Sequence, residues 1–202
     1  MPLNFNTNEG STGAYIRFMP SIGAWMLDGD EVEVSQFIMD LDNISTGWGK
    51  FEAGQAPLWS WDADLSSPTP KPAEDGFKRG FKVNMFSKAT FGDYPVREFA
   101  TTGTGPQMGL QALYAQYEQE VENNKGKVPV VEYTGSVPQK VGKGNTRIPT
   151  LKIIKWVKRP DELSATTGEV KEKFPMSSSA DVNKLAAQEQ KIDNEAFIED
   201  EF

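Results

Sequence analysis

Basic and aromatic residues alternate along residues 76–87, GFKRGFKVNMFS. In an extended strand, side chains two positions apart point to the same side of the sheet. Aromatic rings stack on nucleic-acid bases, and lysine or arginine side chains bind phosphates. The candidate contacts in this segment are Phe77, Lys78, Arg79, Phe81 and Lys82. The alternative, which the pattern leaves open, is that the rings form a core and the lysines a solvated strand face.

The predicted faces of this strand differ in composition. One face contains Phe77, Arg79, Phe81, Val83 and Met85, and the other contains Lys78, Lys82, Asn84 and Phe86.

The same combination of basic and aromatic residues recurs in 148–157, IPTLKIIKWV, which is rich in β-branched residues and predicts a strand. Its candidate contacts are Lys152, Lys155 and Trp156.

The preceding stretch, residues 134–147, is interpreted as a glycine-rich basic loop, TGSVPQKVGKGNTR. Glycines let a backbone approach a phosphate closely. Its candidate phosphate contacts are Lys140, Lys143 and Arg147. A solvent loop without a ligand is the alternative.

Four of the five tryptophans lie in or beside residues 43–75, a stretch without a sustained period that we expect to be a long ordered excursion. This placement is more typical of stacking surfaces than of a barrel interior, although each ring alone fits a core position. Trp59 and Trp61 would share a face if the segment is extended. The candidate stacking residues are Trp48, Trp59 and Trp61, with Trp25 beside them.

Composition excludes several kinds of chemistry. The 202 residues include no cysteine and no histidine, which removes disulfides, thiolate nucleophiles, His or Cys zinc sites and Ser-His-Asp triads. We expect no cofactor and no bound metal. Neither a signal peptide nor a membrane span is expected from the apolar pattern, so the expected location is the cytoplasm, or the host cytoplasm for a phage protein.

Charge is unevenly distributed along the chain. The net charge is −8, but residues 1–160 contain 17 Lys/Arg and 18 Asp/Glu, whereas residues 161–202 contain 4 and 11. Residues 125–159 contain nine Lys/Arg and a single acid, Glu132. We therefore predict a folded domain over 1–160 with a basic region, followed by a flexible acidic tail over 161–202.

The expected elements are mainly strands. We expect strands over residues 15–22, 31–41, 76–87, 94–100, 128–133 and 148–157. A helix is expected over residues 106–124, with Pro106 at its first position. This order predicts an OB-like, five-stranded Greek-key barrel with one helix between strands 3 and 4. A β-sandwich or another small α+β domain is the competing fold.

The end of the tail resembles those of phage and bacterial single-stranded DNA-binding proteins, especially the gene 2.5 type. The resembling motif is EAFIEDEF, the last eight residues. The resemblance implies sequence-independent binding of single-stranded DNA in replication, recombination and repair. It also implies a tail that docks partner proteins and competes with DNA for the basic surface. The partner-binding residues it implies are Phe197, Glu199, Asp200, Glu201 and Phe202. The sequence leaves DNA versus RNA and the oligomeric state open, with a homodimer among the arrangements it allows.

Two rival functions remain at this point. Three D-x-D pairs, Asp28/Asp30, Asp40/Asp42 and Asp62/Asp64, would permit a magnesium-dependent nuclease. A phage structural or assembly protein would also be β-rich, acidic and free of cysteine.

Overall fold

The structure, a computed structural model, describes residues 15–52, 54–142 and 144–164. Contacts within the chain divide it into two units, Met1–Thr167 and Gly168–Phe202, and all described residues belong to the first. None of the helices in the described part is long and apolar enough to cross a lipid bilayer. The elements are β1 (Tyr15–Met19), β2 (Ala24–Leu27), β3 (Asp30–Val32), β4 (Gln36–Met39), η1 (Leu41–Asn43), β5 (Ser45–Lys50), β6 (Leu58–Trp61), β7 (Lys78–Phe86), α1 (Lys88–Phe91), β8 (Val96–Thr101), α2 (Thr104–Glu120), η2 (Val121–Asn124), β9 (Lys127–Val141) and β10 (Gly144–Lys158).

The domain is mainly β, as predicted. Its strands form one sheet in the order β10-β9-β4-β7-β8-β1-β2-β3, and β5 pairs with both β6 and β7. All of these pairs are antiparallel except β1 with β8. The prediction of five strands is wrong, because the described part contains ten strands in a sheet that does not close. The additional strands include the β5–β6 hairpin, which occupies part of the expected excursion over 43–75.

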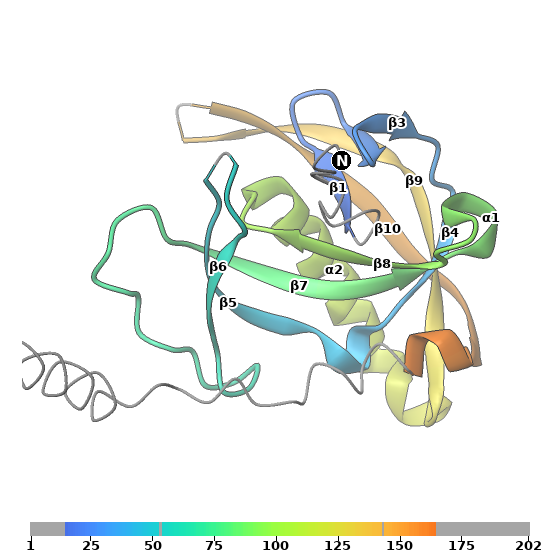
Figure 1. The fold of residues 1–202 in the computed structure, drawn as a ribbon. Helices are drawn as coiled ribbons and strands as arrows, with labels where there is room; N and C mark the ends of the chain where they lie inside the picture. Colours follow the sequence, from blue (N-terminus) through green and yellow to red (C-terminus); the bar gives the residue numbers. More distant parts are fainter. Residues whose placement is uncertain (1–14, 53, 143, 165–202) are drawn as a thin grey trace, which may run out of the picture. The chain divides into compact units, whose positions relative to one another are not determined.

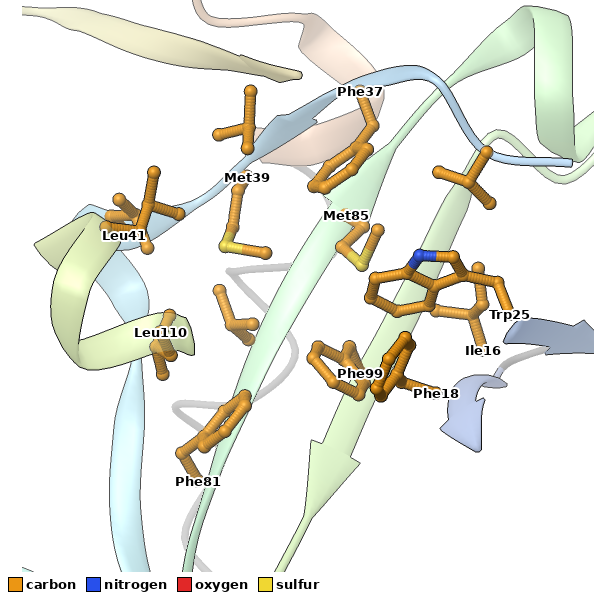
Figure 2. Packing of buried hydrophobic residues seen from close by; sticks show 14 of the residues in the cluster. Ile16, Phe18, Trp25, Phe37, Met39, Leu41, Phe81, Met85, Phe99 and Leu110 are labelled. Atoms are coloured by element: carbon orange, nitrogen blue, oxygen red, sulfur yellow. The ribbon is translucent and has the colours of Figure 1, made fainter. Parts of the chain in front are cut away.

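The main core lies on one face of this sheet, and a smaller buried cluster of Ile38, Val128, Val130 and Leu163 is separate from it, with Phe86 of β7 packed against it. On β7 the buried apolar side chains are Phe81, Val83 and Met85, which confirms that they share a face. Figure 2 shows Trp25 packed against the rings of Phe18 and Phe99, at 5.3 and 5.0 Å between ring centroids. Burying a large apolar side chain stabilises the fold by about 1.5–3 kcal/mol. Trp25 is 1% exposed, so its interpretation as part of a stacking surface is wrong.

Helix α2 lies against strand β10, which is the edge of the sheet (Figure 1). A Cβ atom added at Gly105 would lie 2.2 Å from the Arg147 carbonyl oxygen, and one at Gly109 would lie 2.6 Å from that of Pro149. The two glycines therefore allow the helix backbone to approach the strand closely. The Gln116 amide donates to the Ile153 carbonyl at 3.2 Å and accepts from the Ile153 amide at 3.0 Å. The Gln116 side chain thus satisfies the backbone N–H and C=O groups of Ile153, on the edge strand β10.

The expected basic loop over 134–147 is wrong. Strands β9 and β10 are 15 residues long and continue through this stretch, with Val141 paired to Gly144. The turn between them needs only two residues, one of which is Gly142 with a φ of 58°. The hairpin contains glycines and prolines, which have a weak preference for strands. Prolines are tolerated in a strand at the edge of a sheet, and β10 is such a strand.

Candidate nucleic-acid interface

Trp59 and Trp61 form a stacked pair on strand β6. Their ring centroids are 4.3 Å apart and their planes differ by 9°. The prediction that the two rings share a face is confirmed, since β6 is extended. Phe51 contacts Trp59 edge to face at 5.6 Å and is 47% exposed. Both tryptophans are half-buried. We call Trp59 and Trp61 the aromatic pair.

Three glycines make room for the aromatic pair. Gly47 and Gly49 of β5 lie opposite Trp61 and Trp59, and Gly47 also pairs with Gly80 of β7. A Cβ atom added at Gly49 would lie 2.8 Å from Cζ3 of Trp59, and one at Gly80 would lie 3.0 Å from its Cη2. The indoles therefore occupy the space that a side chain at position 47, 49 or 80 would need. We call these three glycines the glycine seat.

Cations flank the aromatic pair on the same face of the sheet. Lys82 pairs with Ser45, two residues from Gly47, and its Nζ lies 5.2 Å from the Trp61 ring centroid. This distance is within the range of a cation–π interaction. Lys82 also forms a 3.3 Å salt bridge with Glu98. Lys78 lies on the same face, is exposed, and has no described carboxylate within salt-bridge distance. We call this side, opposite the core, the outer face.

Trp48 and Arg79 lie on the opposite side of the same strands. They pair with each other in the β5–β7 register, and the guanidinium carbon of Arg79 lies 5.5 Å from the Trp48 ring centroid. Arg79 donates two hydrogen bonds to Asp62, at 2.9 and 2.6 Å, and Trp48 Nε1 donates to the Thr69 carbonyl at 2.8 Å. The Arg79 hydrogen bonds lower the pKa of Asp62, and that carboxylate raises the pKa of Arg79. Trp48 therefore lies on the opposite face from Trp59 and Trp61, because it pairs with Ser60 whereas the two indoles pair with Gly49 and Gly47.

Burial excludes two predicted stacking rings. Phe81 is 2% exposed and Phe77 is 9% exposed, so neither ring offers a face to a base. Phe81 belongs to the core cluster and contacts Phe99 edge to face at 5.2 Å. The alternation in this segment was correct, but the face that contains Phe81 is the buried one.

The residues predicted on β10 do not join the aromatic pair. Trp156 packs against Tyr117 of α2 at 5.7 Å, and its Nε1 donates a 2.8 Å hydrogen bond to Glu120. This bond lowers the pKa of Glu120. Trp156 is therefore a packing residue rather than an open platform. Lys152 and Lys155 are exposed, but β10 is three strands away from β7 in the sheet.

The tip of the β9–β10 hairpin presents one of its predicted cations to solvent. Lys140 is exposed. Arg147 is half-buried, and its Nε donates to the Ser136 hydroxyl at 3.0 Å, beside Gly23 of the β1–β2 turn. Its role is therefore partly structural. Lys143 and the predicted tail contacts lie outside the described residues; these tail contacts are Phe197, Glu199, Asp200, Glu201 and Phe202.

Arginines bind three of the carboxylates in the acidic pairs, those of Asp40, Asp42 and Asp62. Asp40, which is fully buried, accepts two hydrogen bonds from Arg159 at 2.7 and 2.8 Å, and Asp42 accepts one at 2.7 Å. Tyr117 donates to Asp42, and burial together with this bond raises the pKa of Tyr117. Asp62 is held by Arg79, as described above. The described residues contain no group of three acidic side chains arranged for a metal ion.

The glycine seat was not predicted from the sequence. A usable signal was present, because Gly47-Trp48-Gly49 and Trp59-Ser60-Trp61 have the same period of two. Pairing these segments places the small residues beneath the large ones.

Comparisons of the chain with protein-family models, with curated proteins and with solved structures give no match.

Proposed function

We propose that this chain binds single-stranded DNA without sequence preference, through the outer face around the aromatic pair. The observation that supports this most directly is the stacked Trp59–Trp61 pair with Lys82 over one ring. Partly exposed indoles can stack on bases, each stack contributing about 1–3 kcal/mol whatever the base. Adjacent cations bind the phosphates between those bases. Duplex DNA does not present base faces, so the arrangement favours single strands.

The strand connections support an OB-type fold for this function. Strands β4 and β5 both pair with β7, so they act as two halves of one bent first strand. Strand β7 then pairs with β8, helix α2 follows, and β9 and β10 form the last hairpin, with β9 paired to β4. In OB-folds, the face of the second and third strands and the loop between the first and second bind oligonucleotides. In this proposal, the aromatic pair lies in that loop and over that face.

The proposed biological role is protection of single strands during replication, recombination and repair in the cytoplasm of a bacterium or a phage-infected host. Residues 161–202 are proposed to dock partner proteins. In the absence of DNA, an acidic segment tethered to the domain would bind to the cations of the domain. DNA phosphates would then compete with the segment and displace it. Displacement would then free the segment for partners.

The proposal is tested with labelled oligo-dT of about 16 nucleotides, the upper site size of a single OB domain. Fluorescence anisotropy should show binding by the full chain, with Kd rising steeply as salt increases. Trp59→Ala and Trp61→Ala should each raise Kd about 5- to 150-fold, the equivalent of one lost base stack. Trp48→Phe is the matched control, because Trp48 lies on the opposite side, and it should change Kd less than about twofold.

Two results would contradict the proposal. One is equal affinity for a duplex of the same length. The other is equal Kd values for the two outer-face variants and the Trp48 control. A parallel titration with oligo-U distinguishes DNA from RNA, because only RNA presents a 2′-hydroxyl.

A further inference from the structure

A second concave surface lies beside the aromatic pair on the same outer face. It is a groove of about 640 Å³ between strands β1 and β2 and the turn that joins β5 to β6. Side chains of β1 form one wall, and the turn forms the other. The lining residues include Tyr15, Arg17 and Met19 of β1, and Gln55, Ala56 and Pro57 of the turn.

The walls of the groove combine a cation with exposed apolar surface. Along β1 the exposed and buried residues alternate, with Ile16 and Phe18 in the core. Tyr15 and Met19 are 42% and 41% exposed, so both offer apolar surface to the groove. Arg17 lies between them, is exposed, and has no described carboxylate within salt-bridge distance. The same wall can therefore contact a base and bind the adjoining phosphate.

The acid in the groove is partly neutralised from behind. Asp28 lines the groove, and its carboxylate lies 4.0 Å from the guanidinium of Arg97. Arg97 is 3% exposed, and its Nε and Nη1 atoms have no hydrogen-bond partner among the described residues. Among the charged residues that line the groove, Arg17 and Asp28 have opposite signs. Arg97 behind Asp28 offsets that carboxylate in part, so Arg17 is the cation available to a phosphate.

The groove and the aromatic pair are adjacent in the sheet. Lys82 of β7 lies opposite Ala100 of β8. Arg17 of β1 is level with Ala100, since the parallel register places Ile16 opposite Phe99. Two strand spacings separate Lys82 from Arg17, about 10 Å across the outer face. The β5–β6 connection also links the aromatic pair to the groove. At the start of this connection Phe51 contacts Trp59, and farther along it Gln55, Ala56 and Pro57 line the groove.

The geometry points to the groove as a second nucleotide-binding subsite. A single strand that stacks on the aromatic pair continues across Ala100 and beneath the β5–β6 turn. Arg17 there binds a phosphate, and Tyr15 and Met19 contact the adjoining base and sugar. This inference rests on the proposed function and adds a path for the strand, with the N-terminal hairpin as part of the binding surface.

The test is Arg17→Ala in the full chain, with oligo-dT as the probe. Loss of one phosphate contact from a single strand should reduce the slope of log K against log salt by about 0.7. At low salt, Kd for oligo-dT of about 16 nucleotides should rise about fivefold. Arg17→Lys should retain the wild-type slope. Lys125→Ala is the charge-matched control, because its side chain is 75% exposed on the connection between α2 and β9, and it should leave the slope unchanged.

The possible failures are distinguishable. If Trp59→Ala weakens binding while Arg17→Ala matches the Lys125 control in slope and in Kd, the groove is not a subsite and the proposed function stands. If the wild-type chain does not bind oligo-dT at low salt, both proposals are overturned. A Tyr15→Ser variant gives an independent check, because it should raise Kd without changing the salt slope.

Discussion

The glycine seat offers a way to disturb the aromatic pair without removing either tryptophan. A methyl group at position 49 would lie 2.8 and 2.9 Å from Cζ3 and Cη2 of Trp59, and 3.0 Å from Cγ2 of Thr102. All three neighbours are side-chain atoms, so Gly49→Ala should tilt the Trp59 ring away while the backbone pairing of β5 and β6 persists. We expect the stack with Trp61 to open.

The expected loss is that of one base stack. At about 1–3 kcal/mol, Kd for oligo-dT should rise about 5- to 150-fold. The free energy of unfolding should fall by less than about 1.5 kcal/mol, because Trp59 is only half-buried and the aromatic contact itself contributes about 0.5–1.5 kcal/mol. Anisotropy of a labelled oligonucleotide measures the first quantity, and urea denaturation measures the second.

A double-mutant cycle isolates the mechanism. If Gly49→Ala acts through the indole, it should have no further effect on Kd in a Trp59→Ala background. Gly144→Ala is the control, since an added Cβ there has its nearest neighbour at 3.9 Å and the residue does not have a positive φ. The reasoning is refuted if Gly49→Ala leaves Kd unchanged, or if its effect persists undiminished in the absence of Trp59.

Three further predictions concern stability and regulation. Asp40→Ala should lower the free energy of unfolding by about 1.5–3 kcal/mol in urea denaturation, because it removes two hydrogen bonds from Arg159 and leaves that guanidinium with Asp42; an unchanged free energy of unfolding would contradict this. Because Arg79 lowers the pKa of Asp62 in the folded state, this pair should stabilise the domain above about pH 5 and lose that contribution progressively as the pH falls. The urea midpoint of Asp62→Asn should therefore depend less on pH in this acidic range than that of the wild type, and equal dependence would disprove the linkage. Removal of residues 193–202 should lower Kd for oligo-dT at low salt, whereas an unchanged Kd would argue against competition by the tail.

The strands with clear alternation were predictable from the sequence. In β7 the apolar and polar residues alternate around Phe81, Val83 and Met85, and in α2 the apolar positions recur at the helical period. Sequence alone did not show which face of β7 was buried. That depends on β8, β1 and the helix packing on the same side, and these contacts are distant in the chain.

Several of the strands that were missed have compositions that do not favour strands. Strand β5 contains Gly47 and Gly49, and the distal parts of β9 and β10 contain glycine, proline and lysine. These segments are extended because they pair with a neighbour. The site follows the same rule: Trp59 and Trp61 were identified from their spacing, whereas the seat that positions them required the β5–β6 and β5–β7 registers.

Photocrosslinking tests most directly where the strand of DNA lies. Oligo-dT with bromodeoxyuridine substituted for thymidine is bound to the full chain at low salt and irradiated, and the attached peptides are identified by mass spectrometry. Crosslinks should map to Trp59 and Trp61, with a second set at Tyr15 on the groove wall. Crosslinks confined to the β9–β10 hairpin, around Lys140 or Lys152, would contradict an interface on the outer face.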